Sequence, residues 1–120
     1  MKEYVILLPG DEDTWEQSSA EHKKSVYDVH REFMRRLEER SHVLAGGAEL
    51  AHSRTSWVVR RDGTRPVVTE GPYAESAEQL TGFYLVRTDD LDDLLETVAM
   101  LADADGPVEV RPTVEEVAAS

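Results

Sequence analysis

The sequence predicts a single α+β domain of the ferredoxin-like type, ordered β-α-β, then a hairpin, then β-α-β. The first observation is a repeated pattern, because the apolar, β-rich residues 2–8 and 80–87 each precede an amphipathic helix and a further strand. The second is Asp62-Gly63, a strong hairpin turn signal between two apolar runs. The third is the length of 120 residues, which suits one domain with one small core.

In the first half, residues 2–8 are mostly apolar and predict a strand, whereas residues 9–17 predict a polar loop. Ser18 followed by Glu21 is a capping-box pattern, so a helix is expected over about residues 20–40. Within this helix, His30 falls on the apolar stripe, which places a titratable side chain against the core. The stripe consists of Val26, Phe33 and Leu37, with Val29 and Met34 at its margins.

The middle of the chain predicts three short strands. Residues 43–45 predict the first, which ends at Gly46 and Gly47, where the backbone is either flexible or closely approached. Residues 55–61 and 67–69 flank the Asp-Gly turn and are expected to pair as a hairpin. The hairpin is the addition to the ferredoxin-like pattern.

The second half repeats the order of the first. Residues 80–87 predict a strand, and Thr88-Asp89-Asp90 predicts the start of a second helix. Gly106-Pro107 is expected to end this helix, and residues 108–111 predict the last strand. The apolar face of the second helix is formed by Leu91, Leu94, Leu95, Val98 and Leu101.

The domain is expected over residues 1–113, with residues 114–120 as a C-terminal tail. Both helices should cover one face of an antiparallel sheet. The other face also carries apolar side chains and therefore needs a partner. Two such sheets packed face to face in a homodimer would satisfy this need.

Composition narrows the classes of partner. The net charge is −12, from 25 acidic and 13 basic residues, so neither nucleic acid nor an anionic membrane is expected to bind. There is no cysteine, which excludes disulfides, thiolate metal sites and a cysteine nucleophile. No apolar run approaches the roughly 18 residues of a membrane span, and the N-terminal run is too short for a signal peptide. A cytoplasmic protein is expected.

The most informative segment follows the predicted hairpin, where a strand ends in the turn Glu70-Gly71-Pro72-Tyr73. Turns held by Gly and Pro have fixed backbone geometry, so the groups beside them are well placed. The segment resembles the signature of the YCII-related (DGPF-domain) family, whose four central residues are usually Asp-Gly-Pro-Phe. The resemblance covers nearly the whole chain and implies a dimeric α+β barrel, in agreement with the predicted topology.

His30 and Glu70 are the candidate catalytic residues. An imidazole titrates near neutral pH, and this helix histidine is similar to the active-site histidine of the family. Glu70 matches the acidic residue of the family motif, and a carboxylate there would orient the ring and stabilise its charged form. The alternatives are a core histidine bonded to a backbone carbonyl and a carboxylate that caps a turn. Rival carboxylates are Asp28, Glu75 and Glu78.

Five residues are expected to bind a substrate: Gly46, Gly47, Gly71, Pro72 and Tyr73. The glycines would let a ligand approach the backbone closely, and the alternative for them is ordinary turn chemistry. Tyr73 replaces the phenylalanine of the motif and adds a hydroxyl, which contacts either a ligand or water. Relatives commonly carry a lysine where this chain has Ala77, so any anion contact made by that lysine is expected to be lacking.

Two functions from different classes stay open. The first is a cofactor-independent enzyme acting on a small molecule, in which His30 shuttles a proton, Glu70 orients it and Tyr73 lines the pocket. The second is a non-catalytic ligand-binding or regulatory module. Members of the family are often encoded beside extracytoplasmic-function sigma factors, which implies a link to transcription through such a sigma factor or another protein partner, and an acidic surface suits docking on a basic protein.

Neither a metal nor a cofactor is expected. His22 and His30 are eight residues apart, whereas two ligands on one helix face are four apart. The sequence also contains no glycine-rich phosphate loop.

Overall fold

The computed structural model describes residues 1–115, apart from the side chain of Asp105. The larger part of the expected tail, residues 116–120, lies outside the described residues. In chain order the elements are β1 (Lys2–Asp11), α1 (Glu12–Gln17), α2 (Ala20–Glu39), β2 (Val43–Glu49), the short 3₁₀ helix η1 (Ser53–Thr55), β3 (Trp57–Asp62), β4 (Arg65–Glu70), β5 (Glu78–Thr88), α3 (Leu91–Asp105) and β6 (Glu109–Pro112).

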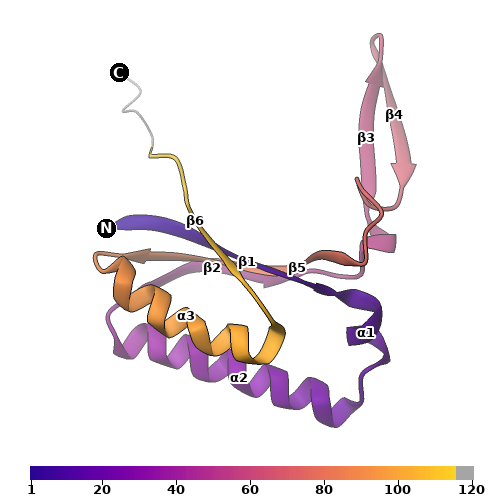
Figure 1. The fold of residues 1–120 in the computed structure, drawn as a ribbon. Helices are drawn as coiled ribbons and strands as arrows, with labels where there is room; N and C mark the ends of the chain where they lie inside the picture. Colours follow the sequence, from indigo (N-terminus) through magenta and orange to yellow (C-terminus); the bar gives the residue numbers. More distant parts are fainter. Residues whose placement is uncertain (116–120) are drawn as a thin grey trace.

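The four-stranded main sheet has the order β2-β5-β1-β6, and each neighbouring pair is antiparallel. Helices α2 and α3 lie together on one side of this sheet (Figure 1). The α+β class, the antiparallel sheet and the additional hairpin are therefore confirmed. Strands β3 and β4 form a separate two-stranded sheet that projects away from the end of the main sheet (Figure 1).

Strand alternation explains where the core lies. Side chains at every second position of β1 are buried against the helices, and the intervening ones point to the opposite face. The helical stripe predicted from the sequence is confirmed, since its three central members are the buried residues of α2. The core cluster contains Tyr4, Ile6, Leu8, Phe33, Leu37, Val86, Leu94, Val98 and Leu101.

The opposite side of the main sheet carries a half-buried apolar group that we name the outer sheet face. It consists of Val5 and Leu7 from β1 together with their cross-strand partners Leu85 and Phe83 from β5. Paired residues of antiparallel strands lie on the same face, so these four side chains are adjacent. Both long helices are on the other side of the sheet (Figure 1).

Residues 9–17 differ from the prediction of a polar loop. Strand β1 continues to Asp11, and its register with β5 shifts between Leu8 and Pro9. Proline has no N–H to donate to the neighbouring strand, and such an irregularity tolerates it. Asp11 then caps α1, because its carboxylate accepts the N–H of Thr14 at 3.0 Å. Helix α2 begins at Ala20, as predicted, but Ser19 rather than Ser18 caps it.

Gly47 is required by the packing of β2 on β5. Its φ is +151°, and a Cβ there would lie 2.6 Å from the carbonyl oxygen of Phe83. Replacing Gly47 by alanine is therefore expected to lower the free energy of unfolding by about 2–4 kcal/mol. Equilibrium urea unfolding measures this loss. Gly46→Ala is the matched control with a small expected effect, since its Cβ would meet Leu85 at an ordinary 3.6 Å; equal losses would contradict this explanation.

His42 lies in the connection between α2 and β2, and its side chain is buried. Its Nδ1 is 2.7 Å from Thr88 Oγ1, and its Nε2 is 2.7 Å from Asp93 Oδ2. Arg40 also donates to Asp93, at 2.6 Å. This network joins the C-terminal end of α2 to the first turn of α3. It therefore fixes the position of these two helix ends relative to each other.

The same network predicts an acid-dependent loss of stability. Hydrogen bonds from Arg40, and then from His42, lower the pKa of Asp93 below its ordinary value of 3.8. A carboxyl group with a lowered folded-state pKa stabilises the protein above its unfolded-state value, and this contribution disappears as the pH falls through the folded-state value. We expect Asp93→Asn to lose less stability than wild type between about pH 5 and pH 2, measured by urea unfolding. Parallel pH profiles would contradict the assignment.

Candidate functional site

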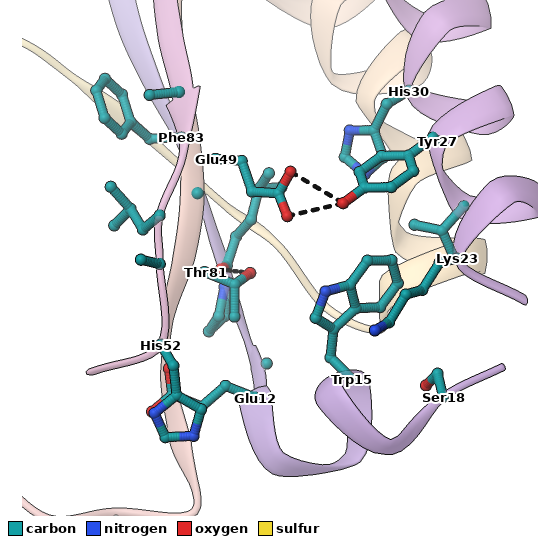
Figure 2. Close-up of a pocket in the computed structure, with 18 of the residues that line it drawn as sticks. Glu12, Trp15, Ser18, Lys23, Tyr27, His30, Glu49, His52, Thr81 and Phe83 are labelled. Carbon is teal, nitrogen blue, oxygen red and sulfur yellow. Dashed lines mark hydrogen bonds and ion pairs between the residues drawn. The ribbon is translucent and has the colours of Figure 1, made fainter. Parts of the chain in front are cut away.

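A pocket of about 710 Å³ opens between α2 and the β2 edge of the sheet, and α1 covers one end of it (Figure 2). This volume falls in the range of small-molecule sites, roughly 300–1,000 Å³. Its walls combine aromatic rings from α1, α2 and β5 with several ionisable groups. A pocket of this size and lining suits a small organic molecule.

His30 lines this pocket and is half-buried, as its place on the apolar stripe of α2 predicts. Its Nδ1 lies 2.7 Å from the hydroxyl of Tyr84 on β5, and the two rings are stacked at 5.9 Å. Phe33, one turn further along α2, packs against Tyr84 at 5.2 Å. The phenol of Tyr84 on the sheet thus holds His30 and fixes the orientation of the imidazole ring. Phe33 of α2 in turn packs against the Tyr84 ring.

The structure does not bring Glu70 to His30 within one chain. Glu70 is the exposed last residue of β4 and pairs with Trp57 across the hairpin. Gly71, Pro72 and Tyr73 follow in the next turn, and the Tyr73 side chain is 87% exposed. None of these four belongs to the described residues that line the pocket. Their site roles stay predictions.

The two halves of the Gly46-Gly47 pair differ. Gly47 lines the pocket, whereas Gly46 is not among the described lining residues. Close packing on β5 already accounts for the glycine at position 47. In the turn after β4, Gly71 has φ +106° and its N–H donates to the Ser56 carbonyl at 2.7 Å, which explains that glycine as a turn residue.

Sequence reasoning missed several aromatic and acidic residues of the pocket, among them Tyr27, Glu49 and Trp15. Tyr27 is one helical turn before His30, so spacing on α2 could have indicated it. Its hydroxyl donates to the Glu49 carboxylate at the end of β2, at 2.9 and 3.1 Å. Trp15 of α1 packs edge-on against Tyr27 at 5.6 Å. Glu49 and Trp15 carry no local signal, because only the packing of β2 and α1 around α2 brings them there.

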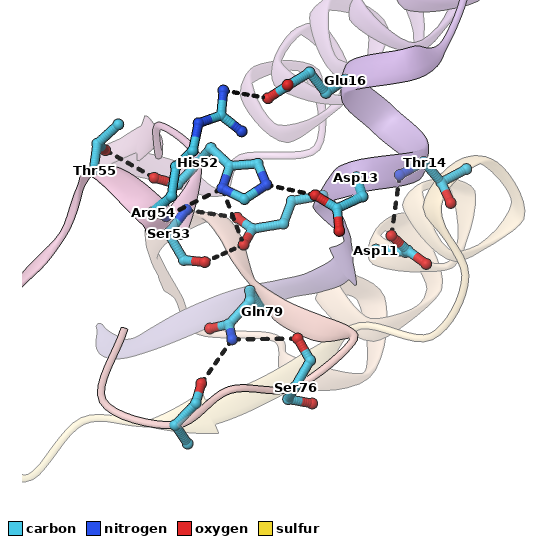
Figure 3. A network of polar contacts seen from close by, with 12 residues as sticks. Asp11, Asp13, Thr14, Glu16, His52, Ser53, Arg54, Thr55, Ser76 and Gln79 are labelled. Atoms are coloured by element: carbon cyan, nitrogen blue, oxygen red, sulfur yellow. Dashed lines mark hydrogen bonds and ion pairs between the residues drawn. The ribbon is translucent and has the colours of Figure 1, made fainter. Parts of the chain in front are cut away.

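A polar network joins α1 to η1 beside the pocket (Figure 3). Nε2 of His52 is 2.7 Å from Asp13, and its Nδ1 is 3.5 Å from Glu12. Glu12 is buried and accepts hydrogen bonds from the backbone N–H of Ser53, at 2.9 Å, and from its hydroxyl. These contacts join α1 to η1 and so hold Trp15 over the pocket.

The residues that the structure describes contain no group of three or more histidine, aspartate or glutamate side chains placed to hold a metal ion. None of the helices described there combines the length and apolar character that crossing a membrane requires.

The fold and the pocket together define a small α+β protein with a histidine at a ligand-sized site beside its sheet. The chain belongs to the YCII-related domain family, whose model matches residues 2–116. An uncharacterised protein of Rhizobium meliloti (strain 1021) is 33% identical over 118 residues, which cover 91% of this chain and 90% of that protein. The resemblance seen in the sequence is therefore confirmed over nearly the whole chain.

Proposed function

We propose that this YCII-related protein is a cofactor-independent enzyme that transfers a proton on a small molecule bound in the pocket. The observation that supports the proposal most is the 2.7 Å contact between His30 and Tyr84 at the wall of a pocket of about 710 Å³. An imidazole held in a fixed orientation beside a ligand-sized space has the properties of a general acid–base group.

His30 is the proposed proton-transfer residue. In the forward direction the imidazole takes a proton from a C–H bond next to a carbonyl, and the electron pair of that bond moves into the enolate. The same imidazole then returns the proton to another atom, so the sequence is an isomerisation with no net loss or gain. Tyr84 is a positioning residue, because it acts on the substrate through the histidine.

We do not assign to Glu70 the role that the turn motif indicated, which was to orient the His30 ring. Within one chain, the phenol of Tyr84 on β5 contacts Nδ1 of His30 at 2.7 Å. A phenol orients an imidazole through one hydrogen bond. Acid–base chemistry at this site therefore does not need Glu70.

We also propose that the protein is a homodimer in which the outer sheet faces of two copies meet, as in a dimeric α+β barrel. Four half-buried apolar side chains support this, because sheets cover such faces by stacking on another sheet. The hairpin adds support, since Trp57 is 69% and Val59 66% exposed on it. The radius of gyration is 16.9 Å, larger than the roughly 14 Å of a compact chain of this length.

The test is catalysed hydrogen exchange. Small carbonyl compounds with exchangeable α-hydrogens, including cyclic ketones and α-amino ketones, are incubated with the protein in D₂O and followed by proton NMR. We expect at least one class to lose its α-proton signal faster than in buffer. If compounds bind in the pocket and none exchanges faster, the enzyme proposal is overturned in favour of a non-catalytic ligand-binding or regulatory module.

A further inference from the structure

Glu49 points its carboxylate from the end of β2 across the pocket toward α2 (Figure 2). Both carboxylate oxygens accept the hydroxyl of Tyr27, at 2.9 and 3.1 Å. This hydrogen bond to Glu49 is the main cause that raises the pKa of Tyr27 above its ordinary value of 10.0. Tyr27 is therefore a neutral donor near neutral pH, and Glu49 is the acceptor.

Among the described residues, four carboxylates line the pocket: Asp11, Glu12, Glu16 and Glu49. Asp11 caps α1, Glu12 is bound by Ser53 and Glu16 pairs with Arg54 at 2.7 Å. In the part of the chain that the structure describes, no cationic nitrogen lies within 4.0 Å of Glu49. Among the described lining carboxylates, Glu49 is the one that neither caps a helix nor lies within ion-pair distance of a basic side chain, since Glu12 lies 3.5 Å from His52.

Lys23 and Arg31, the lysine and arginine among the described lining residues, are engaged elsewhere. Arg31 is paired with Asp28 on the outer surface of α2. The Lys23 ammonium lies 5.8 Å from the centre of the Trp15 ring and donates to the Glu16 carbonyl at 3.3 Å. The Trp15 ring therefore already has one ammonium group over its face, and such an aromatic face attracts positive charge.

We propose that the pocket binds a small organic amine, with the ammonium against Glu49 and beside the rings of Tyr27 and Trp15. Carboxylate and aromatic faces together are the chemistry that recognises an organic cation. His30 is one helical turn from Tyr27 on the same face of α2, so the atoms next to the amine lie toward the histidine. The amine is a substrate, and not only a ligand, if the protein is an enzyme, so this part of the inference rests on the proposed function.

The test uses three probes of one shape and different charge: benzylamine, benzyl alcohol and benzoate. Their binding to the wild-type protein is measured by isothermal titration calorimetry at low salt. We expect benzylamine to bind more tightly than benzyl alcohol, and Glu49→Gln to weaken benzylamine about fivefold without changing benzyl alcohol. Glu96→Gln, an exposed change of the same charge on α3, is the control and should leave all three affinities as they are.

Tighter binding of benzoate would overturn the proposal and indicate Lys23 as the anchor. Unchanged benzylamine selectivity in Glu49→Gln would also overturn it. The same titration with His30→Gln separates this inference from the acid–base proposal. Because His30 is not the proposed anchor, amine binding should persist in that variant even if exchange is lost. If amines bind through Glu49 but no hydrogen exchange is catalysed, the proposal of an amine ligand stands and the proposal of an enzyme is refuted.

Discussion

Replacing His30 by glutamine is expected to lower the rate of catalysed hydrogen exchange by about 10²–10⁴-fold, the usual contribution of a general acid–base group. Glutamine keeps a polar side chain of similar reach at the pocket wall, but it cannot take up and return a proton near neutral pH. Proton NMR in D₂O measures the rate for any compound that the wild-type protein exchanges. Binding of that compound should be nearly unchanged, because the loss concerns the chemical step.

Tyr84→Phe separates positioning from proton transfer. It removes the 2.7 Å contact to His30 and keeps the ring that packs on Phe33. We expect an intermediate loss of exchange rate with binding of the compound nearly unchanged, because the phenol no longer orients the imidazole. If His30→Gln exchanges as fast as wild type while remaining folded, His30 is not the catalytic residue.

The second large effect is expected at the outer sheet face. Replacing Leu85 by lysine places a charge between two stacked sheets, where removing it from water costs roughly 3 kcal/mol or more. The dimer should therefore weaken by at least about 100-fold and become monomeric at micromolar concentration. Sedimentation equilibrium of wild type and variant measures the change.

Leu95→Lys is the matched control for this experiment. Leu95 is 44% exposed on α3, and the two long helices lie on the side of the sheet away from the outer face (Figure 1). The same substitution there should leave the mass unchanged. A wild-type protein that sediments as a monomer at all concentrations would refute the homodimer, and equal dissociation by both variants would refute this face as the interface.

The fold was predictable because its signals are local and mutually consistent. The stripe of Val26, Phe33 and Leu37 indicated which side of α2 is buried, and the Asp-Gly turn indicated the hairpin. Helix α1 was not predicted, because six residues with a tryptophan among acidic side chains have no helical periodicity. Its formation depends on the Asp11 cap and on packing over the pocket.

The site was predictable only in part. Periodicity on α2 placed His30 at a half-buried wall, as the structure shows. Its partner was not predictable by the same means, since Tyr84 is 54 residues away and reaches it through the pairing of β5 in the sheet. Glu70 stood out because of its turn motif, yet a motif fixes local backbone geometry and does not determine which distant side chain it faces. Glu49 has neither periodicity nor motif.

We expect the pocket between α2 and β2, rather than the hairpin, to be the site that binds a ligand. The chain has two tryptophans, and they report on these two places: Trp15 lines the pocket and Trp57 lies on β3. The two indole N–H signals in a proton–nitrogen NMR spectrum are followed while small carbonyl compounds and amines are added. We predict that the Trp15 signal shifts and the Trp57 signal does not. A shift of the Trp57 signal alone, or of neither signal with any compound, would contradict the account.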